Sequence, residues 1–182
     1  MYFQTVGKAN TEETVQFALK KAAEYGIKDI VVASHGGYTA KMLAGKTENL
    51  ICVTHASGYP GPGESDMPDE VRRELVSQGV KILTTTHVLS GAERGISRKF
   101  GGVYPVEIMA QTLRMFGQGV KVCVEVAVMA LDAGLIPYGK DIIVIGGSAH
   151  GADTAVVIRP AHAANIFDNY IAEIICKPGR KQ

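Results

Sequence analysis

The sequence predicts an α/β fold of three layers, a mostly parallel sheet with one antiparallel edge strand between two layers of helices. Short runs rich in Val and Ile alternate with segments of helical period through the first 85 residues. This alternation is typical of parallel strands joined by right-handed crossover helices. The last two strands are joined by connections too short for a crossover helix, so at least one is expected to be antiparallel. The length of 182 residues fits a single domain, 1–182.

The first half of the chain predicts three strands and three helices. Asn10 reads as an N-cap with Glu13 completing a capping box, and Gly26 marks the end of that helix. A segment rich in Gly and Pro, His55 to Asp66, is expected to be a loop. The strands are expected at Asp29 to Ala33, Leu50 to Thr54 and Val80 to Thr84, and the other helices at Thr39 to Ala44 and Pro68 to Gly79.

The second half is expected to begin with an irregular connection, because Thr85 to Gly102 shows no clear period. Lys121, Glu125 and Asp132 fall on one stripe at about 100° per residue, which predicts a helix over Val120 to Ala133. The stripe is interpreted as a solvated edge, with a buried base at Glu125 as the alternative. A further helix is expected at Pro105 to Phe116, and strands at Asp141 to Ile145, Thr154 to Arg159 and Tyr170 to Cys176.

Composition excludes several classes of function. The net charge of +1 is spread along the chain and predicts no nucleic-acid partner. No apolar run reaches the roughly 18 residues of a membrane span, and no signal peptide is visible. The histidines show no metal-ligand spacing, so no metal site is predicted. Apolar neighbours around Cys52, Cys123 and Cys176 indicate buried thiols and a cytoplasmic protein.

A glycine-rich turn between the strand at Asp29 to Ala33 and the next helix is typical of an anion-binding loop. Backbone N–H groups of such a turn point to one place, where phosphate is the usual ligand. An ordinary strand-to-helix turn is the alternative. The turn is neither a Walker loop nor a Gly-x-Gly-x-x-Gly motif. The residues expected to hold phosphate are Ser34, His35, Gly36, Gly37, Thr39 and Ala40.

The ends of other strands carry further candidates for the same site. Ligands of such sheets bind at the carboxyl ends of the strands, where four of the five histidines are placed. Each of these histidines can serve in acid–base chemistry or in a structural hydrogen bond. No set of catalytic residues stands out. The rest of the ligand is expected to lie across Thr54, His55, His87, Gly146, Gly147, Ser148, Asp153 and Thr154.

The segment from Leu89 to Gly102 carries four glycines and three cations. Arg94 and Arg98 are four residues apart, so one helical turn would bring both side chains to one face. Arginine can hold phosphate oxygens in a bidentate manner. The segment is therefore expected either to close over a bound anion or to contact another subunit.

Two stretches resemble the C-terminal domain of pyruvate kinase. They are Val31 to Ala40 followed by Leu50 to Thr54, and Asp141 to Ile158 with its loop Gly146-Gly147-Ser148. In eukaryotic pyruvate kinases these two loops help to hold an effector sugar phosphate. Three further phrases resemble stand-alone pyruvate kinase C-terminal-domain-like proteins, best known from archaea: Leu89 to Lys99, Lys121 to Glu125 and Gly151 to His162.

This resemblance implies flavin mononucleotide (FMN) as the phosphorylated ligand. A homo-oligomer is expected as the assembly. It also shows two departures, because Gly36 replaces a hydroxyl residue and Tyr38 replaces an arginine. Pyruvate kinase activity is not expected, since the catalytic barrel alone takes about 250 residues. A flavin-dependent redox enzyme and an oligomeric sugar-phosphate sensor are the alternative functions.

Overall fold

A seven-stranded sheet forms the centre of the molecule, with strand order β1-β7-β6-β5-β2-β3-β4. The computed structural model describes residues 1–180. The strands are β1 (Tyr2–Phe3), β2 (Asp29–Ala33), β3 (Asn49–Val53), β4 (Lys81–Leu83), β5 (Ile142–Gly146), β6 (Thr154–Arg159) and β7 (Tyr170–Pro178). The helices are α1 (Thr11–Tyr25), α2 (Tyr38–Leu43), α3 (Asp69–Ser77), α4 (Gly91–Phe100), α5 (Pro105–Arg114) and α6 (Gln118–Asp132), with 3-10 helices η1 (Lys8–Asn10) and η2 (Ala163–Asp168).

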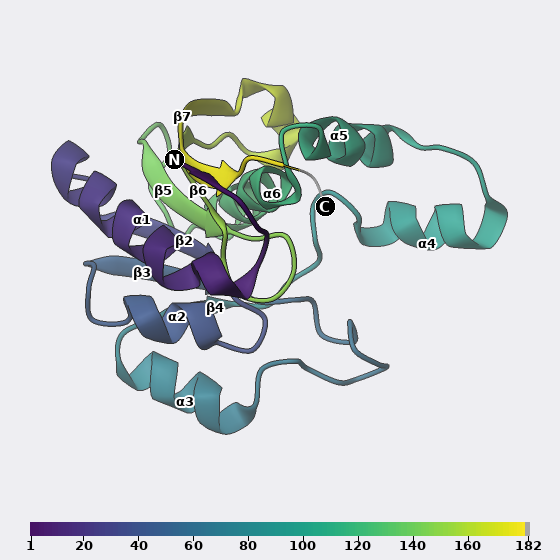
Figure 1. The fold of residues 1–182 in the computed structure, drawn as a ribbon. Coiled ribbons are helices and arrows are strands. Elements are labelled where there is room, and N and C mark those ends of the chain that lie inside the picture. Colours follow the sequence, from purple (N-terminus) through teal and green to yellow (C-terminus); the bar gives the residue numbers. More distant parts are fainter. Residues whose placement is uncertain (181–182) are drawn as a thin grey trace.

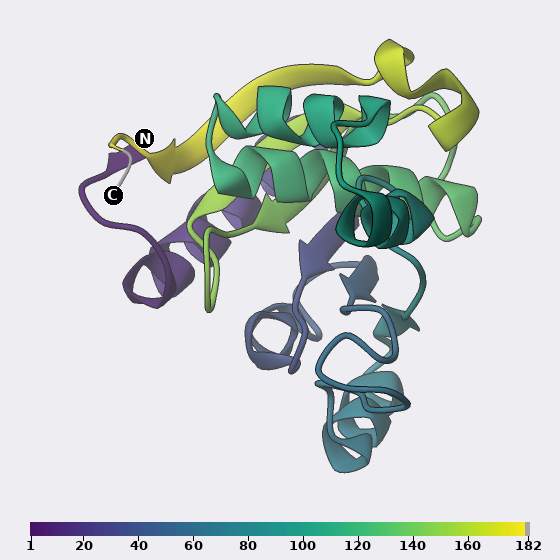
Figure 2. The ribbon, with the colours of Figure 1, turned by 90° about the vertical axis from the view of Figure 1, so that its right-hand side faces the viewer.

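Helices lie on both faces of the sheet, which confirms the predicted three-layer α/β class (Figures 1 and 2). Helices α1 and α2 cover one face, and α6 covers the other with α5 packed against it. Alternate residues of the central strands point into two apolar layers. Ile30 and Val32 face α1 and α2, whereas Val31 faces α6. None of the helices in residues 1–180 is long and apolar enough to cross a membrane.

One strand, β6, is antiparallel to its neighbours. The antiparallel strand was predicted at an edge of the sheet, whereas β6 lies inside it. Strands β2, β3, β4 and β5 are parallel, β6 is antiparallel to both β5 and β7, and β7 is parallel to β1. The short η2 connection returns the chain beside β6, so β7 covers it. The N-terminal segment then adds β1, and the Met1 ammonium donates to the Ile175 carbonyl at 2.8 Å.

Two local expectations are wrong. Asn10 does not cap α1, because its side-chain amide donates to the Thr5 carbonyl at 2.8 Å. The segment predicted to be irregular contains α4, which extends away from the sheet (Figure 1). No residue of α4 is buried, and its short apolar row of Ala92, Ile96 and Phe100 lies between glycines that obscured the period. The elements β1, η1 and η2 were not predicted at all, being too short to produce a pattern.

Helix α6 packs closely against the sheet through two glycines. A Cβ on Gly119 would lie 2.0 Å from Oγ1 and 2.5 Å from Cβ of Thr154 on β6. A Cβ on Gly146 would lie 2.9 Å from the Gly119 carbonyl oxygen and 3.0 Å from Cys123 Sγ. The absence of side chains at these two positions therefore sets how near α6 lies to β5 and β6.

We expect Gly119→Ala to destabilise the protein by about 1–3 kcal/mol, because the new methyl group overlaps a buried threonine. Gly95→Ala is the matched control: no atom lies within 4 Å of its added Cβ, and the change improves an exposed position of α4. That control is expected to be neutral or to stabilise by about 0.5–1 kcal/mol. Urea unfolding measures both, and equal stability of the two variants would contradict the close approach of α6.

Candidate functional site

The carboxyl ends of four parallel strands meet at one edge of the sheet. The chain passes from β2 outward to β3 and β4, then returns to place β5 on the other side of β2. The loops after β2 and β5 therefore leave in different directions, and this is where ligands bind in open α/β sheets. A cavity of about 520 Å³ lies at this point and reaches the loops after β2, β3, β4 and β5.

Half of the predicted site residues line this main cavity. They come from four strand ends and from α4, and the structure brings them together around one cavity. The predicted residues that line it are Ser34, His35, Thr54, His55, His87, Arg94, Gly147 and Ser148.

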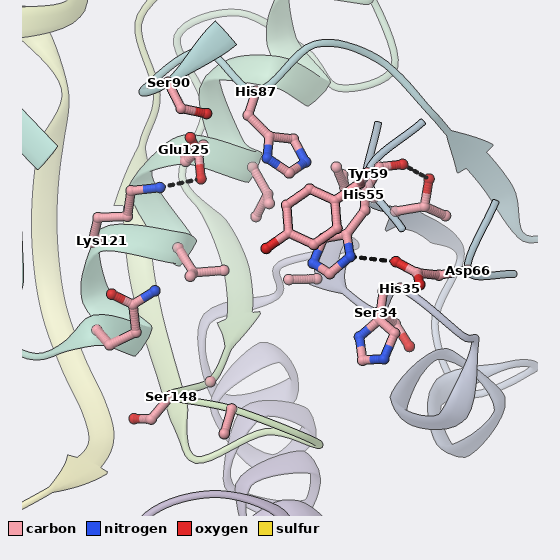
Figure 3. Close-up of a pocket in the computed structure, with 18 of the residues that line it drawn as sticks. Ser34, His35, His55, Tyr59, Asp66, His87, Ser90, Lys121, Glu125 and Ser148 are labelled. Carbon is pink, nitrogen blue, oxygen red and sulfur yellow. Dashed lines mark hydrogen bonds and ion pairs between the residues drawn. The ribbon is translucent and has the colours of Figure 1, made fainter. Parts of the chain in front are cut away.

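One wall of the cavity is a group of imidazole and phenol rings (Figure 3). The rings of His35 and His55 are stacked, with centroids 5.0 Å apart and planes 7° apart. Tyr59 lies 4.0 Å from His55 and 5.9 Å from His87, and His150 lies 5.6 Å from His35. These flat faces, with their polar edges, suit a flat heteroaromatic ligand.

A carboxylate orients the central ring of this wall. Asp66 Oδ2 lies 2.5 Å from His55 Nδ1, and both side chains are partly buried. A hydrogen bond from Nδ1 to the carboxylate leaves Nε2 as the nitrogen with a free lone pair. Within residues 1–180 Nε2 has no hydrogen-bond partner. The arrangement can hold a ligand N–H or O–H, or accept a proton from it.

His87 is held as a neutral ring. Its Nε2 accepts a hydrogen bond from the Ala56 N–H at 3.3 Å, which places its own proton on Nδ1. Burial lowers the pKa of His87 from its usual value of 6.5, and burial likewise lowers the pKa of His35. Both rings are therefore uncharged at neutral pH.

The opposite wall carries a buried ion pair (Figure 3). Lys121 and Glu125 are each 5% exposed, and Lys121 Nζ lies 2.5 Å from Glu125 Oε2. The other carboxylate oxygen accepts the Leu89 N–H at 3.0 Å. Burial lowers the pKa of Lys121, and the charge of Glu125 opposes that shift. The prediction of a solvated stripe was thus wrong for these two residues and holds only for Asp132, which is exposed.

A second hollow, of about 320 Å³, adjoins the main cavity at the loop after β2. The two share Ala33, Ser34, His35, His150 and Gly151. Within the loop, Ser34 Oγ accepts the Ala40 N–H at 3.5 Å. The other lining residues of this hollow are Lys8, Gly36, Tyr38 and Thr39.

Six of the predicted residues line neither space. Gly37, with φ of 87°, faces α3, where an added Cβ would lie 2.6 Å from Val71 Cγ1. Asp153 is fully buried and accepts the N–H groups of Gly7 at 2.8 Å and Ser148 at 3.2 Å, so it holds the loop after β5. The complete set is Gly37, Ala40, Arg98, Gly146, Asp153 and Thr154.

Several lining residues were missed. Tyr59 and Asp66 lie in a loop whose path no pattern predicts. Lys121 and Glu125 did carry a signal, since opposite charges four residues apart in an otherwise apolar helix indicate a buried pair. Within residues 1–180 no group of three His, Cys, Asp or Glu side chains could hold a metal ion. The missed polar residues are Lys8, Tyr38, Tyr59, Asp66, Ser90, Arg114, Gln118, Lys121, Glu125 and His150.

The fold and the site define a three-layer α/β domain with a crevice where the strand order reverses. A family model described as the pyruvate kinase alpha/beta domain matches residues 12–158, so the chain belongs to that family. Among solved structures it is similar to Cryptosporidium parvum pyruvate kinase in complex with ADP, at 16% sequence identity and a TM-score of 0.38. The similarity covers 92% of this chain and 24% of that one.

We expect stability to fall as the pH drops below about 6.5, in part because of His87. Its pKa is lower in the folded than in the unfolded protein, so the unfolded chain takes up the proton first. Stability is therefore complete above the unfolded pKa and is lost as the pH falls toward the folded one. His87→Gln should reduce this dependence in urea unfolding between about pH 7.5 and 5.5. An NMR titration of His87 at or above 6.5 would contradict the burial argument.

We expect Lys121→Met to cost about 3–5 kcal/mol, because it leaves the Glu125 carboxylate buried without its partner. The double variant Lys121→Met/Glu125→Gln should lose less than the sum of the two single variants. Lys41→Met is the control, since Lys41 pairs with Glu74 at the surface and such pairs are worth about 0–1 kcal/mol. The free energy of unfolding is measured with urea. If the double variant loses the sum of the two single losses, Lys121 and Glu125 are not coupled.

Proposed function

We propose that the crevice binds a phosphorylated small molecule with a flat ring, and that this ligand is FMN. The proposal rests on one observation: the main cavity and the hollow adjoin, and they are lined by residues of different chemistry. The hollow at the loop after β2 offers hydroxyl groups and a cation, and the adjoining cavity offers a wall of imidazole and phenol rings. A phosphate and a flat ring joined by a short chain match that pair of spaces.

The hollow suits the phosphate. Ser34 and Thr39 supply hydroxyl groups, and Gly36 leaves room, since an added Cβ there would meet only the Asp66 carbonyl oxygen at 3.8 Å. Tyr38 stands where the resembling pyruvate kinase loop has arginine. The Lys8 ammonium lies 4.8 Å from the centre of the Tyr38 ring, so a cation from the N-terminal segment occupies this place instead.

The main cavity suits the ring. Its volume of about 520 Å³ falls within the range of about 300–1,000 Å³ that is usual for small-molecule sites. Tyr59 and His87 offer faces for stacking, and the oriented His55 offers a hydrogen-bonding nitrogen at the ring edge. A bound flavin supplies hydride or single-electron transfer. The residues described here would bind it, orient it and shield one of its faces.

We infer no pyruvate kinase activity for residues 1–182. A catalytic barrel alone takes about 250 residues, and residues 1–180 of this chain form the α/β domain instead. The proposal is therefore a binding function, with catalysis on the flavin as its extension. A sugar-phosphate sensor would use the same hollow but would leave the wall of rings without a partner.

Titration of the purified protein with FMN, followed by quenching of flavin fluorescence, tests the proposal. We expect FMN to bind at least about tenfold more tightly than riboflavin, which lacks the phosphate and its charge-assisted hydrogen bonds. Gly36→Val should fill the hollow and remove that preference, leaving riboflavin binding unchanged. Gly95→Val, at an exposed position of α4, is the control for the added side chain.

Two results would count against parts of the proposal. An unchanged FMN affinity in Gly36→Val would exclude the hollow as the phosphate site. Binding of fructose 1,6-bisphosphate with no binding of FMN or riboflavin would reject the flavin and favour the sensor.

A further inference from the structure

The helical side of the main cavity carries three cations facing one carboxylate. Arg94 of α4, Arg114 at the end of α5 and Lys121 of α6 all line it, and Glu125 is paired with Lys121. The positive charges of both arginines lie near enough to Lys121 to help lower its pKa. None of the three lines the hollow beside Lys8. This side of the cavity therefore has an excess of two positive charges away from the proposed phosphate site.

Neither arginine is neutralised by the protein. Arg114 Nε donates to Gln118 Oε1 at 2.7 Å, and no carboxylate within residues 1–180 forms an ion pair with Arg94 or Arg114. The nearby carboxylates of Glu93 and Glu107 accept hydrogen bonds from other groups. Glu93 accepts the Glu107 N–H at 2.9 Å, and Glu107 accepts the Ser97 hydroxyl at 2.6 Å, where α4 meets α5.

The buried ion pair tethers this side of the cavity. Glu125 accepts the Leu89 N–H, which ties the start of α4 to α6, and Ser90 follows with its hydroxyl in the cavity lining. Arg94 lies one turn further along α4 and is half-buried. Partly desolvated cations without a counter-charge are unfavourable, so this arrangement favours an anion from outside the protein.

We propose that Arg94, Arg114 and Lys121 form a second anion site, which takes the carboxylate or phosphate of a small molecule bound at the same time as FMN. The two guanidinium groups suit a bidentate contact with either oxyanion, and the ammonium adds a third donor. The inference rests on the proposed function in one respect: the flavin phosphate lies in the hollow beside Lys8. The second molecule then lies in the main cavity, next to the flavin ring.

The experiment uses the FMN-loaded protein with inorganic phosphate and with oxalate as probes, and measures their Kd by calorimetry. We expect Arg94→Gln and Arg114→Gln each to weaken the probe about tenfold, with FMN affinity unchanged. Arg98→Gln is the matched control, because Arg98 lies on the same helix but is exposed and outside the cavity. Arg94→Lys should restore part of the affinity by restoring the charge. Whichever probe binds more tightly identifies the group that the site prefers.

Three results would overturn the second site. One is probe affinity that is unchanged in both variants. Another is a loss of FMN affinity with unchanged riboflavin affinity in both variants. That result would place the flavin phosphate on this side of the cavity, while the proposed binding of FMN by the unsubstituted protein would still stand. A third is a changed native mass with unchanged affinities, which would make α4 a subunit interface. If the protein binds no FMN, the same titrations on the unloaded protein still test the anion site, because the variants then report on the probe alone.

Discussion

The reversal of strand order between β2 and β5 is the constraint on which the rest of the site depends. Both strands are parallel and paired in register, so their ends lie side by side, yet their loops must leave in different directions. The opening that results cannot be filled by a crossover helix, since the helices lie on the two faces of the sheet. Ser34 and Gly147 stand at its two sides, and both spaces of the candidate site adjoin it.

Asp153 and the N-terminal segment hold that opening in shape. The Asp153 carboxylate accepts the N–H of Gly7, the N–H of Ser148 and the hydroxyl of Thr154, so one fully buried group joins three parts of the chain. A buried carboxylate without hydrogen bonds would destabilise the fold. These three hydrogen bonds offset the cost of removing Asp153 from water. Lys8 follows directly after Gly7. Asp153, which lines neither space, therefore helps to fix the position of the Lys8 ammonium in the hollow.

The sequence predicted the longer elements that pack on the sheet and missed α4, which buries no residue, and the short elements β1, η1 and η2. Strands β2, β3 and β5 and helices α1 and α6 were predicted because their apolar periods are set by packing on both faces of the sheet. Helix α4 buries none of its residues, and its apolar row of Ala92, Ile96 and Phe100 was not recognised among the surrounding glycines and charges. His35, His55 and His87 line one cavity because a parallel sheet brings the carboxyl ends of its strands together, and the strand pattern predicts those ends. Tyr59, Asp66 and Arg114 reach the cavity through the paths of loops and helices, which depend on tertiary contacts that no local pattern contains.

The two walls of the main cavity divide recognition between charge and shape. Burial lowers the pKa of His35 and His87, so these rings are neutral at pH 7 and carry little of the positive charge of the site. That charge comes from Lys8 at one end and from Arg94, Arg114 and Lys121 at the other. The neutral rings of His35 and His87 can lie against a flat uncharged ring without the cost of desolvating an imidazolium. The buried Lys121–Glu125 pair is then understood less as a source of stability than as the link that keeps α4, and with it Arg94, against the cavity.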